Sequence, residues 1–413
     1  MRFGAPLGAA AVVALIIVLS TPHRDGGGLE TVFILSPKGG SVAVNGTCPG
    51  PLLRIGPGEW ATIRVVNQLN VEATIHWHGI SQRGTPESDG VAWVTQKPIE
   101  PGCEFIYRFQ APAEAGTYWY HGHMGTLRVD GLYGALLVMP VLDPTPPVWM
   151  LADAFKFQYG LYPSTRVDEP EPSAILVNNE VLSLSATGIV RVINAAEMSS
   201  FTIEGALTVF ELDSVSVEPF ETSNVTLVAG QRASIMGMGK VNINTQAGMF
   251  PVVRSWAGTL SFDKTEFGRV TKVPAMENAT VHVVWEIDGN SVNGYPFEQP
   301  TALADYSEQN TFGSGAVPFV VPVGSIVEVE VRNTDEGSHG FHIHGFRLLV
   351  VSTSPGGEPV GTYRDVVAIP PLGNVTVRFD ANQPGVWISH CHIDWHMRNG
   401  LAALFVVKSF PYS

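Results

Sequence analysis

The chain has 413 residues, of which 45% are hydrophobic and only 15% charged, a composition that excludes a disordered chain and favours several packed domains. Its formal net charge of −14 and pI near 5.3 argue against nucleic acid and anionic membrane surfaces as partners. The 43 glycines and 30 prolines, many of them in turn-like pairs, favour short strands over long helices.

The first 28 residues have the pattern of a targeting segment. Met1 and Arg2 give a positive start, an apolar run follows over 7–19, and polar and glycine-rich residues come next. We predict a signal peptide over 1–28 and a secreted product. No clean cleavage site is visible, so a retained N-terminal anchor stays open. Four N-x-[ST] sequons fit a glycosylated secreted protein: Asn45, Asn224, Asn278 and Asn374.

The rest of the chain consists of strand patterns with period two between turn signals. Clear examples cover residues 61–66, 117–120, 133–138, 326–331 and 375–379. Long amphipathic helical patterns are absent from the sequence, so the prediction is an all-β fold built from sandwiches.

Two segments repeat each other. A turn, a strand and HWHG (76–79) occur near the start, and a turn, a strand and HIHG (342–345) occur near the end. Each is followed at a similar interval by a second histidine motif, at His121 in the first copy and His390 in the second. A weaker third copy between them has no histidine, and we interpret it as a spacer and substrate wall. The predicted domains are residues 29–142, 143–275 and 276–413.

The three cysteines are too few for a disulfide scaffold. Whether Cys48 and Cys103 pair with each other stays open. Cys391 lies inside a histidine motif and has another interpretation.

Ten of the 12 histidines fall into four tight clusters. On a strand, residues i and i+2 point to the same face, so each H-x-H pair projects two imidazoles side by side. Four pairs supply eight imidazoles, which suits a cluster of several metal ions with open positions for a small ligand. The pairs are His76 and His78, His121 and His123, His342 and His344, and His390 and His392.

The segment HCHIDWH (390–396) carries the most specific signal. Alternation places Cys391 on the face opposite its two histidine neighbours, where it can share another metal with His339 and His396. Two histidines and one cysteine in a trigonal site form the blue-copper arrangement. The backbone beside Cys391 then gives electrons a short covalent path to the other metal cluster.

Two other interpretations were weighed. H-x-H pairs also occur in zinc hydrolases, usually with carboxylate ligands in α/β barrels. This chain has no βα alternation, and zinc gives no reason for a cysteine between two histidines. A purely structural role for the histidines is the second interpretation. Neither a glycine-rich phosphate loop nor a G-x-S-x-G elbow is present in the sequence.

With these motifs, nearly everything after the leader resembles the multicopper oxidases, which include laccases, ascorbate oxidases and iron-oxidising enzymes. The resemblance implies three consecutive cupredoxin-like Greek-key domains and four copper ions: one type 1, one type 2 and a type 3 pair. It implies that His339, Cys391 and His396 hold the type 1 copper. It assigns the type 2 copper to His76 and His342. It assigns the type 3 pair to His78, His121, His123, His344, His390 and His392.

The resemblance also implies roles for residues beside these ligands. Leu401 stands at the axial position of the type 1 copper and cannot ligate, which favours the laccase-like branch over ascorbate oxidases, where this residue is Met. Met397 is not expected to reach that site. Asp89 and Asp394 are expected to supply protons for the reduction of O2, although Asp89 is alternatively a turn residue before Gly90.

The reducing substrate is less determined. Any donor delivers electrons to the exposed edge of His396 or His339. Glu169 aligns with an acidic residue of iron oxidases and Glu197 lies near a substrate acid of laccases, but a surface glutamate needs no function. We predict a monomeric oxidase that takes electrons from a phenol or aryl amine and reduces O2 to water. A ferroxidase, an ascorbate oxidase and a non-catalytic copper-binding relative are the alternatives, and the complete set of eleven ligands argues against the last.

Overall fold

The computed structural model describes residues 28–140, 143–155, 172–180, 188–245, 248–250, 255–256, 276–303 and 318–409. The predicted signal peptide, apart from its last residue, and Glu169 therefore lie outside the described residues. Among the described residues, no helix has the length and apolar character needed to cross a membrane.

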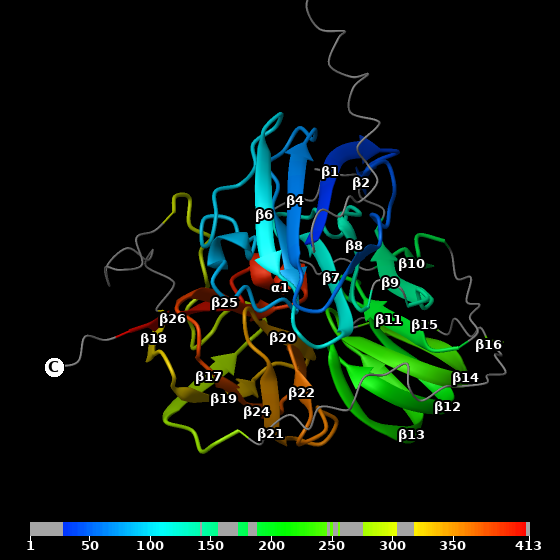
Figure 1. Ribbon diagram of the computed structural model, residues 1–413. Helices are drawn as coiled ribbons and strands as arrows, with labels where there is room; N and C mark the ends of the chain where they lie inside the picture. The colour runs from blue at the N-terminus through cyan, green and yellow to red at the C-terminus, as the bar shows by residue number, and fades with distance from the viewer. Residues whose placement is uncertain are drawn as a thin grey trace, which may run out of the picture.

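The N-terminal domain, blue to cyan in Figure 1, consists of two four-stranded sheets. The first sheet has the order β2 (Ser41–Val44), β1 (Gly28–Lys38), β4 (Trp60–Asn67), β6 (Glu104–Gln110). The second has the order β3 (Leu53–Ile55), β8 (Tyr133–Val138), β7 (Gly116–Gly122), β5 (Ile75–His78). Alternate residues of β4 are buried, among them Ala61, Ile63 and Val65, and they form the core with β7 and β8.

The C-terminal domain has the same plan with two five-stranded sheets, yellow-green to red in Figure 1. One has the order β17 (Val281–Ile287), β19 (Ile326–Asn333), β24 (Asn374–Asp380), β21 (Leu348–Thr353), β22 (Tyr363–Arg364). The other has the order β18 (Phe319–Pro322), β26 (Ala402–Lys408), β25 (Gly385–Cys391), β20 (His339–Ile343), β23 (Val366–Ile369). The one α-helix of the described residues, α1 (Asp394–Arg398), follows β25.

The described part of the middle domain is one eight-stranded sheet, not two separate sheets. The chain order is β9 (Val148–Ala154), β10 (Ala174–Val177), β11 (Val190–Asn194), β12 (Ser200–Leu212), β13 (Val215–Leu227), β14 (Arg232–Thr245), β15 (Gly248–Phe250), β16 (Ser255–Trp256). Irregular pairing of β12 with β13 after Glu204 and Val209 bends these long strands, and the sheet encloses its own apolar core.

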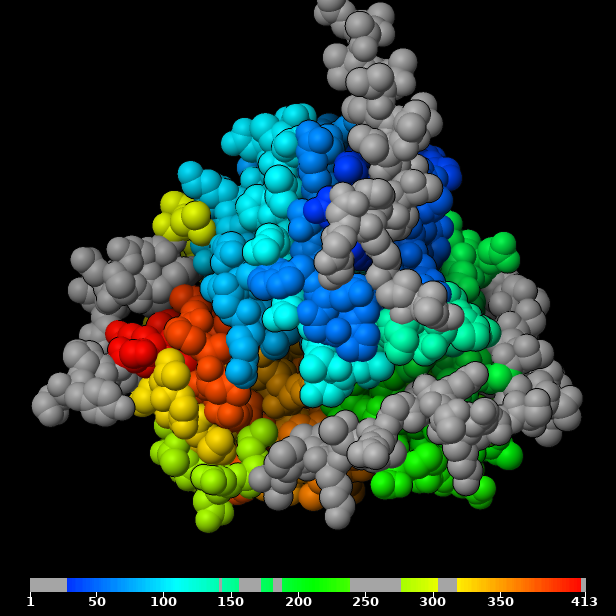
Figure 2. Space-filling view, in the orientation of Figure 1, coloured from blue at the N-terminus to red at the C-terminus, as the bar shows by residue number. Residues whose placement is uncertain are grey.

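The all-β prediction is confirmed, and each of the five strands predicted by example lies within an observed strand. The three domains are in contact in Figures 1 and 2, with the middle domain against both others. The boundaries at 142/143 and 275/276 remain predictions, because residues 141–142 and 257–275 are not among those described.

The structure shows whether Cys48 and Cys103 form a disulfide. Cys48 and Cys103 are free thiols, so the structure contradicts a disulfide between them. Cys48 is half-buried with its Sγ 3.5 Å from the carbonyl oxygen of Gly131, whereas Cys103 is exposed in the turn before β6.

Candidate metal centre

Eight histidines meet where the N-terminal and C-terminal domains face each other, and we call them the histidine cluster. Sheet register places His76 opposite His121 across β5 and β7, and His342 opposite His390 across β20 and β25. The ring centroids of His76 and His344, from different domains, are 3.9 Å apart. All eight rings are buried: His76, His78, His121, His123, His342, His344, His390 and His392.

The nitrogens of these rings gather in small groups. His390 Nε2 lies 3.3 Å from His123 Nε2 and 3.1 Å from His344 Nε2. His392 Nε2 lies 3.3 Å from His78 Nδ1. Further groups of three nitrogens within 4.8 Å of one another join His76 with rings of both domains. Such spacing suits nitrogens that share metal ions.

The outward nitrogens of the rings are tied to the protein. Carbonyl oxygens can only accept, so the Nδ1 atoms of His76 and His342 donate to the carbonyls of Asp89 (2.8 Å) and Asp365 (2.6 Å). His121 and His390 bond neighbouring carbonyls in the same way. The buried Nε2 atoms of His76, His121 and His342 have no hydrogen-bond partner among the described residues. Lone pairs that point inward from anchored rings fit a metal, because a metal would satisfy otherwise costly buried acceptors.

The pKa values of several rings in the cluster favour metal binding. Burial lowers the pKa of His78, His121 and His344 well below the usual range, and positive charge on neighbouring rings would lower it further. Burial likewise lowers the pKa of His390 to about 4. These four rings are therefore neutral near pH 7, which is the form that binds metal.

A second group, the thiol site, consists of His339, Cys391 and His396. Cys391 Sγ lies 3.6 Å from the Nδ1 atom of each histidine, and the two Nδ1 atoms are 3.2 Å apart. Burial alone would raise the pKa of Cys391, but hydrogen bonds from the two histidines lower it to about 6. Burial would lower the pKa of His339, yet hydrogen bonds to Asp335 and Cys391 raise it to about 9. A thiolate beside two imidazoles is a soft donor set that suits copper, and a metal bound to His339 would displace its proton.

Leu401 and Met397 follow Cys391 in the chain and pack in different places. Leu401 is fully buried in the same core cluster as Cys391; its carbonyl accepts from Cys391 N (3.1 Å) and its N–H donates to His396 O (2.9 Å). Met397 packs in a different cluster, against residues such as Ile388, and lines a separate cavity.

The two predicted proton suppliers lie beside the histidine cluster. Asp89 is fully buried; its Oδ2 accepts from His344 Nδ1 at 2.9 Å, while its Oδ1 has no hydrogen-bond partner among the described residues. It also ends a 3-10 turn before Gly90, so the alternative prediction of a turn position describes it as well. Asp394 begins α1, forms an ion pair with Arg128 and lines a cavity of about 270 Å³ together with His123.

The structure contradicts a substrate role for Glu197. This residue is only 2% exposed, its Oε2 accepts from Arg128 Nη2 (2.8 Å), and its Oε1 accepts from Trp395 N (2.7 Å). Glu197 therefore ties the middle domain to α1 and has no surface to offer a substrate.

Sequence reasoning missed three residues beside the two sites. The guanidinium of Arg128 donates to His392 O at 2.8 Å. Asp335 Oδ2 accepts from His339 Nε2 at 2.9 Å and is part-exposed. Asp365 contacts both His78 and His342. The i,i+4 spacing from Asp335 to His339 is a usable signal, whereas no local pattern marks Arg128 or Asp365.

A larger cavity opens beside the cluster. It has a volume of about 1020 Å³, and its lining includes His76, His342 and Asp365 together with charged residues such as Arg83 and Glu114. Because two rings of the histidine cluster line this cavity, it reaches the cluster.

Comparison with known proteins identifies the family. Models of multicopper oxidase domains match residues 31–142, 161–246 and 273–410. A laccase of Phlebia radiata is 30% identical, over 90% of this chain and 87% of that protein. The iron transport multicopper oxidase fetC of Epichloe festucae is 29% identical, over 88% of this chain and 72% of that protein.

Solved structures show the same fold. Fet3p, a multicopper oxidase that functions in iron import, superposes with a TM-score of 0.76 at 21% identity, covering 92% of this chain and 90% of that one. The laccase of Botrytis aclada has a TM-score of 0.72 at 23% identity, covering 91% and 87%. Together with the converging histidines and the buried thiol, these likenesses place the chain in the multicopper oxidase family, among its laccase-like members.

Proposed function

We propose that the protein oxidises a phenol or aryl amine one electron at a time and reduces O2 to water. One observation carries the proposal. Cys391 contacts His339 and His396 on one side, while its two neighbours in the chain, His390 and His392, belong to the histidine cluster. An electron that enters at the thiol site thus reaches the cluster through a few covalent bonds.

The copper assignment is the one that the resemblance to multicopper oxidases implies for the matching motifs. We assign the type 1 copper to the thiol site and the type 2 copper to His76 and His342. The Nε2 atoms of His76 and His342 are buried and unpaired among the described residues, as is that of His121, which leaves them available to a metal. We assign the type 3 pair to His78, His121, His123, His344, His390 and His392. Four bound coppers would supply the one-electron steps and the four-electron reduction of O2.

Electron entry is proposed at His396. Its exposed fraction is 9%, against 1% for His339 and 0% for Cys391, so it offers the most accessible edge of the thiol site. Leu401 fills the core beside this site with an apolar side chain and supplies no ligand atom, which supports a high potential.

Proton supply is proposed for Asp89 and Asp394. Reduction of O2 to water consumes protons inside a closed site, and a carboxyl group within hydrogen-bond reach can deliver them. Asp89 has one oxygen bonded to His344, and its other oxygen, which has no hydrogen bond among the described residues, lies 3.4 Å from His76 Nδ1. The carboxylate of Asp394 is 16% exposed, so it can exchange protons with water in the cavity that it shares with His123.

A ferroxidase is the second candidate, because Asp335 gives the thiol site a carboxylate. Its side chain is 29% exposed and bonded to His339 Nε2. Ferric iron is a hard cation that favours oxygen ligands, so a carboxylate here would help an iron atom lose its electron. Glu169, which lies outside the described residues, stays the candidate for a further carboxylate.

The proposed setting is a secreted, glycosylated monomer. The leader pattern and the exposed Asn224, Asn278 and Asn374 support this proposal. Asn45 is the weakest of the four sequons, because its amide nitrogen donates to Val32 O and its oxygen accepts from Ile34 N.

The test is a steady-state comparison of a phenol, ascorbate and ferrous iron, with oxygen uptake recorded for each. We expect the phenol to have the highest kcat/KM and four electrons to be consumed per O2. If ferrous iron has the higher kcat/KM, the laccase-like donor is wrong and the ferroxidase replaces it. The absence of oxygen uptake with every donor, despite a full copper load, would contradict the oxidase itself.

A further inference from the structure

The middle domain has no histidine, yet it reaches the histidine cluster through a buried cation. Arg232, at the start of β14, is 0% exposed. Its Nε donates to Thr117 O on β7 of the N-terminal domain at 3.2 Å. Its Nη1 and Nη2 donate to the two oxygens of Asp365 in the C-terminal domain, at 2.5 and 2.7 Å. One side chain of the middle domain therefore joins all three domains.

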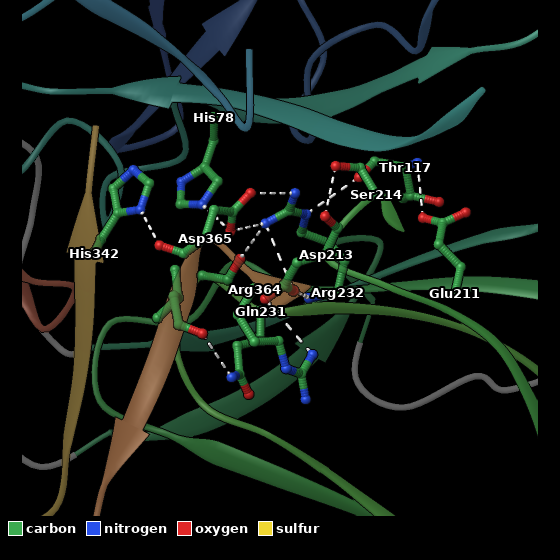
Figure 3. Close-up of polar contacts among 12 residues, drawn as sticks. His78, Thr117, Glu211, Asp213, Ser214, Gln231, Arg232, His342, Arg364 and Asp365 are labelled. Atoms are coloured by element: carbon green, nitrogen blue, oxygen red, sulfur yellow. Dashed lines mark hydrogen bonds and ion pairs between the residues drawn. The ribbon is translucent and has the colours of Figure 1, made fainter. Parts of the chain in front are cut away.

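Asp365 in turn holds two rings of the cluster, as Figure 3 shows. Its backbone carbonyl accepts from His342 Nδ1 at 2.6 Å, which leaves His342 Nε2 facing inward. Its Oδ1 lies 3.2 Å from His78 Nε2. An ionised carboxylate paired with a guanidinium can only accept, so His78 Nε2 carries the proton and Nδ1 has the free lone pair. That Nδ1 atom lies 3.3 Å from His392 Nε2, inside the cluster.

His78 is thus anchored to the protein through a different ring nitrogen from the other histidines of the cluster named below. His76, His121, His342, His344 and His390 are each anchored to the protein through Nδ1. His78 is anchored through Nε2. The residue that makes this difference is Asp365, and Asp365 has both oxygens fixed by Arg232.

We propose that Arg232 is a positioning residue for the metal centre: by clamping the carboxylate of Asp365, it fixes which nitrogen of His78 faces the cluster. A bidentate guanidinium holds a carboxylate in one plane, and this plane determines where the carboxylate accepts from the ring. The inference rests on the proposed function in that the cluster is taken to bind copper. The middle domain then contributes a positioning residue to the metal centre, in addition to separating the two other domains.

The backbone beside His78 is built for this contact. Gly79 has φ +88°, and a Cβ atom there would lie 2.8 Å from Arg232 Nη2 and 3.0 Å from Asp365 Oδ2. A larger residue would push the ion pair away from His78, and the positive φ would add strain. The glycine of the HWHG motif therefore lets the ion pair approach the ring.

Direct ligation by Asp365 is the competing interpretation. An oxygen of Asp365 lies within 4.8 Å of ring nitrogens of His78 and His342, so distance alone permits it. Both oxygens, however, already accept from Arg232. The guanidinium neutralises the negative charge of Asp365, which would otherwise attract a metal ion. The contacts therefore favour orientation of His78 over ligation.

The experiment compares Arg232→Met, Arg232→Lys and Asp365→Asn with Glu211→Gln. Glu211 is a matched control, because it is a buried carboxylate of the same junction that bonds Thr117 N and Arg191. Glu211→Gln weakens the contact between the same two domains and leaves Asp365 with Arg232. Arg232→Lys keeps the buried positive charge but cannot donate two parallel hydrogen bonds to Asp365. It therefore tests the role of the guanidinium even if Arg232→Met does not fold.

The first readout is Cu(I) affinity of the copper-free protein under anaerobic conditions, by competition with a chelator. Loss of an outer partner of a ligand weakens metal binding about 10–100-fold. We expect this loss at the histidine cluster for Arg232→Met and Asp365→Asn, a smaller loss for Arg232→Lys, and none for Glu211→Gln. Blue absorbance from the thiol site should persist in all four variants, because none of the changed residues contacts it.

The second readout is the protonation site of His78, from nitrogen-15 chemical shifts of the copper-free protein labelled at histidine. Wild type and Glu211→Gln should carry the proton on Nε2, whereas Arg232→Met and Asp365→Asn should show a mixture. Unchanged shifts and affinity in folded Arg232→Met would overturn the inference, as would equal losses in Arg232→Met and Glu211→Gln. Failure of the wild type to bind copper would instead overturn the proposed function, and the nitrogen shifts would still test the role of Arg232.

Discussion

The buried cation Arg128 allows a quantitative test of how the domains are joined. It is 1% exposed and pairs with Glu197, which is 2% exposed, and with Asp394, whose side chain is 16% exposed. It also donates to the carbonyl oxygens of Ala196 (2.8 Å) and His392 (2.8 Å). Arg128→Met keeps most of the side-chain volume but removes every one of these donors.

The cost of Arg128→Met follows from what is left behind. Asp394 can regain water, whereas Glu197 stays buried without its cation and two carbonyls lose a donor. Removal of one partner of a buried ion pair costs about 3–5 kcal/mol. We expect the free energy of unfolding to fall by that amount in urea titrations of the copper-free protein, monitored by tryptophan fluorescence. The copper-free form is used so that metal affinity does not contribute.

A second change separates the charge from the packing. Glu197→Gln in the Arg128→Met background removes the stranded charge and keeps an acceptor for Trp395 N. We therefore expect it to recover roughly 1–3 kcal/mol, as an interaction energy between contacting residues. Arg64→Met is the control, because Arg64 and its partner Glu104 are both exposed. Such a surface ion pair should contribute nothing measurable to the free energy of unfolding. If the double variant is no more stable than Arg128→Met, stranded charge is not the cause of the loss.

Three further predictions concern the thiol site. Cys391→Ser should abolish blue absorbance and leave copper at the histidine cluster; a wild type that is colourless with a full copper load would contradict the type 1 assignment. Leu401→Met should lower the potential of the type 1 copper in a redox titration by adding a weak axial ligand, and an unchanged or higher potential would mean that Leu401 is not axial. Asp335→Ala should reduce kcat/KM for ferrous iron more than for a phenol, because only iron needs an oxygen ligand at His339, and Glu169→Ala should act in the same direction. Equal losses with both donors would assign Asp335 a purely structural role.

Local patterns predicted much of the candidate site. Strand periodicity identified β4, β19 and β24, because one face of each of these strands packs on a core and the other does not. The predicted β7 and β8 were also found, although both of their faces are buried. The same period of two placed Cys391 and its neighbours on opposite faces, as the structure has them. Histidine spacing therefore indicated both groups of ligands.

Alignment to relatives was less reliable for residues outside these motifs. Glu197 lies close in sequence to a substrate acid of laccases, but the structure turns it inward onto Arg128 and the start of α1. A position within a loop does not determine which way a carboxylate points, because that depends on the cation packed opposite it.

The sequence by itself determined the fold class, the eleven candidate ligands and their division into a cluster and a thiol site, because these depend on residue type and on spacing within short segments. The tertiary structure alone decided which nitrogen of each ring faces inward and which charged side chains contact the outer side of the rings. His78 and Asp365 are 287 residues apart in the chain, and Arg128 and His392 are 264 apart. No local rule connects such pairs, since only the packing of three domains against one another brings Arg232, Asp365 and His78 into contact.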